Sequence, residues 1–148
     1  MIAIYWRRIA EGRLRDKPGG LLAIDILIAE DEPSILESLD FILRRAGWSV
    51  ESVTDGQAAL DGVRRLKPRM LVLDVMLPRR SGFDVLKQLR GDSATRDLPV
   101  LILTAKGQQQ DRRTAQDLGA DGFVTKPYSN ADVVGAVRQL LDGYARPA

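Results

Sequence analysis

The sequence predicts an α/β fold, a doubly wound five-stranded parallel sheet with helices on both faces. Short apolar runs alternate with segments of helical periodicity along most of the 148 residues. Several of these runs are apolar at every position, which is typical of strands that are buried on both faces. Since alternating strands and helices form parallel sheets covered by their crossover helices, one such sheet accounts for the whole pattern.

The repeating strand and helix unit begins at Asp25 and occurs five times. In the first unit an apolar run precedes a helix whose apolar face ends at Ala46, just before Gly47. The predicted strands span residues 26–29, 48–53, 70–73, 100–103 and 123–125. The predicted helices span residues 35–46, 55–66, 83–90, a segment that ends near 118, and 129–141. A chain of this length buries one sizeable core, so we expect one domain.

Strand composition also predicts the order of the strands in the sheet. The runs ILIA, MLVL and VLIL carry no polar residue, so the first, third and fourth strands should be central. The second strand carries Ser49, Glu51 and Ser52, which indicates an edge. These assignments fit the flavodoxin-like order 2-1-3-4-5, in which ligands bind beyond the carboxyl ends of strands one and three.

The chain contains neither cysteine nor histidine, and this excludes several classes of site. Disulfides, thiolate catalysis and thiolate-bound metals are ruled out, as is any histidine ligand or base. A bound metal must therefore be a hard cation held by oxygen atoms. The lack of cysteine is compatible with the reducing cytoplasm, where we expect the protein to act.

The formal net charge of +2 comes from the first 23 residues, where five basic residues accompany two acidic ones. The remaining chain carries 17 basic and 18 acidic residues, which argues against nucleic-acid binding. We expect residues 1–23 to be a basic, flexible N-terminal extension, residues 24–143 to be the domain and residues 144–148 to be a tail. A membrane-surface or partner-binding arm is the alternative for the extension, and no segment reaches the roughly 18 apolar residues of a membrane span.

Polar side chains follow the strands of the predicted sheet. Glu30 and Asp31 follow the first strand, Asp74 the third, Thr104 the fourth and Lys126 the fifth. Because the carboxyl ends of parallel strands meet at one edge, we expect these side chains to lie together. Three carboxylates in one crevice repel each other unless they share a cation. With only oxygen ligands on offer, the sequence predicts a Mg²⁺ or Mn²⁺ site.

Asp74 is the candidate nucleophile of this site. A carboxylate can attack a phosphoryl donor and form an acyl phosphate. The cation, the Lys126 ammonium and the Thr104 hydroxyl would then neutralise the phosphoryl oxygens, and no general base is required. Each residue alone has an ordinary structural explanation, such as a helix cap or a solvated lysine. Their combination at four strand ends favours a phosphoacceptor site.

The sequence resembles the receiver domains of bacterial response regulators over residues 25–141. The matching segments are ILIAEDEP, LVLDVMLPRRSGFDVL, VLILTA and GADGFVTKPYS. The resemblance implies that Glu30, Asp31 and Asp74 hold the metal together with the backbone carbonyl of Met76. It also implies that Asp74 is phosphorylated by a sensor histidine kinase or a phosphotransfer protein.

The resemblance further implies a switch. Thr104 and Lys126 would contact the phosphoryl oxygens, and a cis peptide bond before Pro127 would place the lysine. Phosphorylation would draw Thr104 toward the phosphate and reorient Phe123. This change would reshape the surface of the fourth helix, fifth strand and fifth helix for a downstream protein partner or a phosphorylation-dependent homodimer. Gly122 stands where the family often has a second aspartate, which weakens the expectation of a charged dimer interface.

Such a protein is a regulator and not a turnover enzyme, although it supports its own phosphorylation and a slow autodephosphorylation. Met76 and Lys106 occupy positions that influence the lifetime of the acyl phosphate in the family. About seven residues follow Leu141, too few for a DNA-binding domain. We therefore expect output through protein contact and no direct nucleic-acid binding by this chain.

Several alternatives remain open at this point. Within the receiver interpretation, the chain could be a phosphorelay intermediate or a receiver cut from a longer regulator. A haloacid-dehalogenase-like phosphatase would carry a second aspartate where Met76 stands. A flavodoxin-like FMN protein would need a hydroxyl-rich loop where Glu30 and Asp31 lie. A pseudo-receiver that is never phosphorylated would not need the complete set of site residues.

Overall fold

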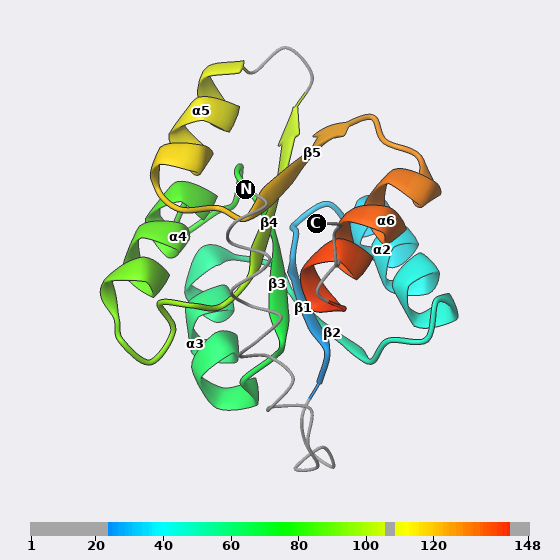
Figure 1. Cartoon of the computed structure of the whole chain (residues 1–148), viewed down its shortest axis with the longest axis horizontal. Helices are drawn as coiled ribbons and strands as arrows, with labels where there is room; N and C mark the ends of the chain where they lie inside the picture. Colours follow the sequence, from blue (N-terminus) through cyan, green and yellow to red (C-terminus); the bar gives the residue numbers. More distant parts are fainter. Residues whose placement is uncertain (1–23, 106–108, 143–148) are drawn as a thin grey trace, which may run out of the picture.

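The computed structural model describes residues 24–105 and 109–142. The predicted extension (1–23), Lys106 and the predicted tail (144–148) lie outside the described residues. Strands and helices alternate through the described part (Figure 1). They are β1 (Ile26–Ala29), α2 (Pro33–Arg45), β2 (Val50–Val53), α3 (Gly56–Leu66), β3 (Met70–Asp74), α4 (Gly82–Gly91), β4 (Val100–Ala105), α5 (Gln109–Asp117), β5 (Gly122–Lys126) and α6 (Asn130–Leu141).

The strands form one parallel sheet in the order β2-β1-β3-β4-β5, as predicted. Helices α2 and α6 cover one face, and α3, α4 and α5 cover the other (Figure 1). Ala29 pairs with both Val53 and Leu73, and Asp74 pairs with Leu103. This register confirms the doubly wound fold and makes the carboxyl ends of β1 and β3 neighbours.

The core has two apolar layers, one on each face of the sheet. Strand β1 contributes to both, with Leu27 and Ala29 in the layer under α3, α4 and α5, and Ile26 and Ile28 in the layer under α2 and α6. Successive side chains of a strand point to opposite faces. A strand covered on both faces must therefore be apolar throughout, which explains the continuous apolar runs.

Strand β2 is an edge strand, as its composition predicted. Glu51 and Ser52 are exposed, whereas Val50 is buried. The strand begins at Val50, two residues later than the sequence predicted. Ser49, just before it, donates its N–H to Oδ2 of Asp25 (2.9 Å) and its Oγ accepts from the N–H of Asp25 (2.8 Å). These side-chain hydrogen bonds fix the entry of the strand.

Short polar side chains begin three of the described helices. Asp55 caps α3, Ser81 caps α4 and Ser129 caps α6, each by accepting from a backbone N–H of the first turn. In α6 the carboxylate of Asp132 also accepts from the N–H of Ser129 (3.1 Å), which completes a capping box. Ser129 is therefore the cap and not the first helical residue. Within the described residues, no helix combines the length and apolar character needed to cross a bilayer.

A buried ion pair lies at the edge of the sheet where β4 and β5 begin. Asp121 is 0% exposed, and its Oδ2 accepts from Arg90 Nη2 (3.0 Å) and from the N–H of Val100 (2.8 Å). The guanidinium of Arg90 also donates to the carbonyl of Gly119 from Nε (3.0 Å) and Nη2 (2.9 Å). The pair thus links α4 to the starts of β4 and β5.

Candidate functional site

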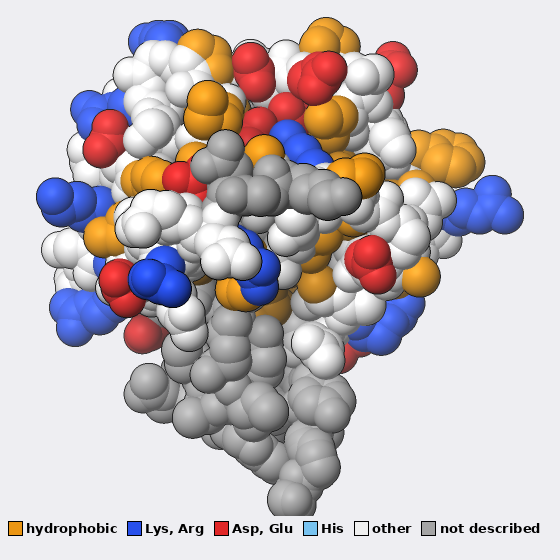
Figure 2. Space-filling model, turned by 90° about the horizontal axis from the view of Figure 1, so that it is seen from above, with side chains coloured by type: hydrophobic (Ala, Val, Ile, Leu, Met, Phe, Trp, Pro, Cys, Tyr) orange, Lys and Arg blue, Asp and Glu red, His pale blue; other side chains and the backbone are white. Residues whose placement is uncertain are grey.

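The residues predicted for the site meet at the carboxyl edge of the sheet. Glu30 and Asp31 directly follow β1, and Asp74 is the last residue of β3. Thr104 lies near the end of β4, and Lys126 ends β5. Figure 2 looks onto this edge and shows acidic side chains gathered near the middle of the face, with a basic side chain beside them.

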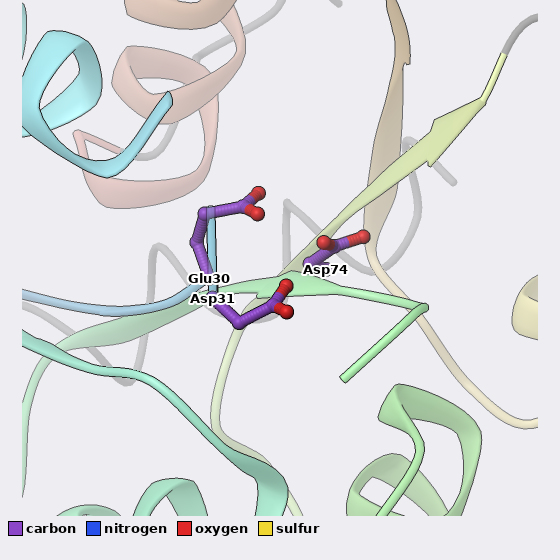
Figure 3. A group of neighbouring side chains, drawn as sticks. All are labelled: Glu30, Asp31 and Asp74. Carbon is purple, nitrogen blue, oxygen red and sulfur yellow. The ribbon is translucent and has the colours of Figure 1, made fainter. Parts of the chain in front are cut away.

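Three carboxylates form an acidic cluster in which one oxygen from each lies within 4.8 Å of the others. Figure 3 shows Glu30, Asp31 and Asp74 around a common space. Glu30 and Asp74 are 1% and 4% exposed, whereas Asp31 is exposed. Three oxygen donors at this spacing fit a hard divalent cation such as Mg²⁺.

Lys126 brings a positive charge to two of these carboxylates. Its Nζ lies 3.4 Å from Oε1 of Glu30 and 3.5 Å from Oδ2 of Asp74. The peptide bond from Lys126 to Pro127 is cis. One ammonium against three carboxylates leaves the cluster with an excess of negative charge, which favours a further cation.

The carboxyl of Glu30 is affected by its burial and, to a smaller extent, by this excess of negative charge. Burial, together with the nearby charge of Asp74, raises the pKa of Glu30 to about 7. A hydrogen bond from the N–H of Glu32 (3.1 Å) and the charge of Lys126 oppose this rise. Burial and the same two carboxylates also raise the pKa of the neighbouring Tyr128 to about 12, so its phenol stays neutral.

Thr104 presents a hydroxyl that no described residue uses. Its side chain is buried, and Oγ1 has no hydrogen-bond partner among the described residues. An unsatisfied buried hydroxyl costs about 1–3 kcal/mol. A buried hydroxyl that carries such a cost is typical of a group that binds a ligand. A phosphoryl oxygen is a suitable ligand atom, because it accepts a hydrogen bond from a hydroxyl.

Two further predicted residues lie near the end of β3 and on β5. Met76 donates its N–H to Oδ1 of Asp74 (3.2 Å), and its side chain is 73% exposed. The role predicted for its carbonyl stays a prediction. Phe123 lies on β5 opposite Ile102 of β4, half-buried against the layer under α3, α4 and α5.

Sequence reasoning missed Gly82, which shapes the loop after Asp74. Gly82 is the first residue of α4, and its N–H donates to the carbonyl of Val75 (2.9 Å). A Cβ at this position would lie 2.8 Å from the Cα of Val75 and closer still to the carbonyl oxygen of Asp74. Glycine lets the helix approach the end of β3 this closely. The sequence feature that could have indicated this close approach is a glycine directly after Ser81, the residue that caps α4.

Residues 26–138 match the protein family described as the response regulator receiver domain. The probable transcriptional regulatory protein TcrX of Mycobacterium tuberculosis is 43% identical over 118 residues, which are 80% of this chain and 50% of TcrX. The chain spans about half the length of the curated relatives it matches.

Solved structures of receiver domains have the same fold. A putative response regulator from Chloroflexus aurantiacus has a TM-score of 0.77 at 31% identity, covering 80% of this chain and 98% of that one. The receiver domain of the sensor histidine kinase PA1611 from Pseudomonas aeruginosa, solved with magnesium in its active site cleft, has a TM-score of 0.74 at 26% identity, with coverages of 80% and 98%. These comparisons give no support to the phosphatase or the flavin-binding alternative. By sequence and by fold, the chain belongs to the response regulator receiver domain family.

Proposed function

We propose that residues 24–143 form a receiver that accepts a phosphoryl group on Asp74 from a sensor histidine kinase or a phosphotransfer protein. One observation carries the proposal: the buried carboxylate of Asp74 lies in one cluster with Glu30 and Asp31, with the Lys126 ammonium 3.5 Å away. This arrangement supports the proposal, because phosphoryl transfer needs a nucleophile surrounded by neutralising charges. We propose the cytoplasm as the compartment, since a chain without cysteine is compatible with a reducing environment.

In the proposed transfer, an oxygen of Asp74 attacks the phosphorus atom and forms an O–P bond. The P–N bond of the donor phosphohistidine breaks, and its electron pair leaves with the imidazole nitrogen. Lys126 would neutralise one phosphoryl oxygen and the unpaired hydroxyl of Thr104 would donate to another. We expect Glu30, Asp31, Asp74 and the Met76 carbonyl to hold Mg²⁺ or Mn²⁺, which when bound neutralises charge on the phosphoryl group.

The proposed output is a change of surface and not a chemical product. Movement of Thr104 and Phe123 would alter the surface made by α5, β5 and α6, where we propose that a downstream protein or a second copy of the chain binds. The acyl phosphate would hydrolyse slowly, since the exposed side chain of Met76 next to Asp74 offers no acid or base. The pathway role, as relay intermediate or as part of a longer regulator, follows from the identity of that partner.

Phosphorylation by a small donor tests the proposal directly. We expect incubation with acetyl phosphate and Mg²⁺ to add one phosphoryl group to the wild type and none to Asp74→Asn, as measured by intact mass. The adduct should be labile to base and should not form when EDTA is present. Asp97→Asn, at an exposed aspartate in the loop before β4, is the matched control and should be phosphorylated like the wild type. Equal adduct on Asp74→Asn, or phosphorylation unaffected by EDTA, would contradict the assignment.

Removing the exposed carboxylate of the cluster tests the proposed metal site. We expect Asp31→Asn to weaken Mg²⁺ binding by about tenfold or more, because a carboxylate within a few ångströms of the ion loses its charge. Isothermal titration calorimetry gives the dissociation constant. Without metal, the variant should be at least as stable to unfolding as the wild type, since the side chain is exposed and its charge no longer repels the other two carboxylates.

The neighbouring Glu32 supplies the control for this metal test. Its side chain is exposed and lies outside the acidic cluster, so Glu32→Gln removes an equal charge one residue away. We expect Glu32→Gln to bind Mg²⁺ with nearly wild-type affinity. Equal losses in the two variants would show that only the general negative charge matters.

A further inference from the structure

Phe123 has a partner on α5 that the sequence did not indicate. The guanidinium carbon of Arg112 lies 4.2 Å from the centroid of the Phe123 ring. The other cation–ring contacts of the described residues, Arg45 with Phe41 and Arg138 with Trp48, are longer at 5.9 and 5.1 Å. All fall within the roughly 6 Å at which a cation is attracted to a ring face. The ring of Phe123 is thus held between the core layer beneath it and a guanidinium.

Phe123 and Thr104 face the same side of the sheet. The register pairs Ile102 with Phe123 and Thr104 with Thr125. Side chains two residues apart on a strand share a face, so Thr104 and Phe123 both point toward the layer under α3, α4 and α5, from neighbouring strands. Because protein interiors are close-packed, we expect a displacement of Thr104 to change the space available to the ring.

Two features of the arrangement coincide. The hydroxyl of Thr104 is buried without a partner among the described residues, and Arg112 is stacked on Phe123. The stack is therefore present in an arrangement in which the Thr104 hydroxyl has no partner among the described residues. Within the described residues no ion pair engages Arg112, so no carboxylate competes with the ring for its charge.

We propose that Arg112 is a positioning residue of the switch: its stack on Phe123 opposes the movement of Thr104 toward a phosphorylated Asp74. The inference rests on the proposed function and adds to it a residue that sets the balance between the two arrangements. A ligand that binds only one arrangement binds more weakly in proportion to the population of the other. Loss of the stack should therefore tighten the binding of a phosphoryl analogue.

The test measures binding of fluoroberyllate, an analogue of the phosphoryl group on an aspartate, to the full chain in the presence of Mg²⁺. We expect Arg112→Gln to bind it about five-fold more tightly than the wild type, because one cation–π contact is lost from the competing arrangement. Arg112→Lys keeps a cation without the planar group, so its affinity for fluoroberyllate should lie between those of the wild type and Arg112→Gln. Arg113→Gln removes the same charge from the neighbouring, exposed position of α5 and should bind like the wild type.

A second measurement follows the ring itself. The chain contains three phenylalanines, so ring-labelled phenylalanine gives few NMR signals, and Phe123→Leu assigns the one from Phe123. Without the analogue, this signal in Arg112→Gln should shift toward its position in the saturated wild type.

Three results would overturn the inference. Wild-type affinity and an unshifted signal in Arg112→Gln would remove the role of the stack. An equal effect of Arg113→Gln would show that only net charge matters. A wild type that neither binds fluoroberyllate nor accepts a phosphoryl group would overturn the proposed function and this inference with it. If the wild type is phosphorylated normally and Arg112→Gln leaves fluoroberyllate binding unchanged, only this inference is overturned.

Discussion

Replacing Asp121 with alanine is expected to lower the free energy of unfolding by about 3–5 kcal/mol. The carboxylate is fully buried and accepts hydrogen bonds from Arg90 and from the N–H of Val100. Its removal takes a buried negative charge away from the Arg90 guanidinium and an acceptor away from the N–H of Val100. A typical domain is stable by only about 5–15 kcal/mol, so the loss is a large fraction of the total. Equilibrium unfolding in urea, monitored by circular dichroism, measures it.

Two further variants make the Asp121 experiment specific. Asp121→Asn keeps the size of the side chain and an oxygen for Val100, so it should lose less than the alanine variant. Asp97→Ala removes an exposed aspartate from the loop before β4 and should change the free energy of unfolding by no more than about 0.5 kcal/mol. A loss below about 1 kcal/mol in Asp121→Ala would show that the ion pair contributes little.

The substitution Gly82→Ala is expected to lower the rate of phosphorylation of Asp74 by about 100-fold, because displacements near 1 Å in a reacting group have effects of this size. The added methyl group would meet the carbonyl oxygen of Asp74 and the Cα of Val75, both of which are backbone atoms. The end of β3 must then shift, and the nucleophile shifts with it. Overpacking should also lower the free energy of unfolding by about 1–3 kcal/mol. The rate is measured with acetyl phosphate and Mg²⁺, as the growth of the adduct with time.

Gly91, at the other end of the same helix, is the matched control. A Cβ at Gly91 meets no atom within 4 Å. Gly91→Ala should therefore be phosphorylated at the wild-type rate and should stabilise the domain by about 0.5–1 kcal/mol, because alanine restricts the unfolded chain more than glycine does. Wild-type phosphorylation kinetics in Gly82→Ala would contradict the role given to its close approach.

The fold could be predicted from the sequence because a strand that is buried on both faces is apolar at every position. Strand β1 contributes alternate residues to two core layers, so it must be apolar throughout, and the polar second strand could only be an edge. The site could be predicted for a related reason. Parallel strands end at a common edge, so polar residues after separate strands, such as Asp74 and Lys126, come together whatever their distance in sequence.

The different environments of Glu30 and Asp31 could not be predicted. In the sequence they are an acidic pair at the end of one strand. In the structure Glu30 is buried, contacts Lys126 and has a raised pKa, whereas Asp31 is exposed. Which neighbour points inward depends on the direction in which the chain leaves the strand. That direction is set by contacts the sequence does not display, such as the hydrogen bond from the N–H of Glu32 to Glu30.

Contacts between single residues far apart in sequence were also beyond prediction. Asp121 was part of a matching segment, but nothing in the sequence indicated Arg90, 31 residues earlier, as its partner. Arg112 was one of several charged residues on a polar helix, and the sequence did not indicate its stack on Phe123, the residue of the proposed switch. Such pairs depend on how α4 and α5 lie on the sheet, and many sequences of the same pattern would place other side chains there.

The ion pair and the acidic cluster lie at opposite ends of the same strand, since Asp121 precedes β5 and Lys126 ends it. Five residues of strand separate the two ends by about 16 Å. Changes at sites this far apart usually add within about 0.5 kcal/mol where the sites share no partner. The free energy of unfolding and the chemistry of the proposed phosphorylation site can therefore be changed independently in this domain. A lineage that adapts to heat, or a designer who builds a sensor, can change the stability of the domain at the start of β5. The rate and lifetime of the proposed phosphorylation, which depend on the other end of the strand, then stay the same.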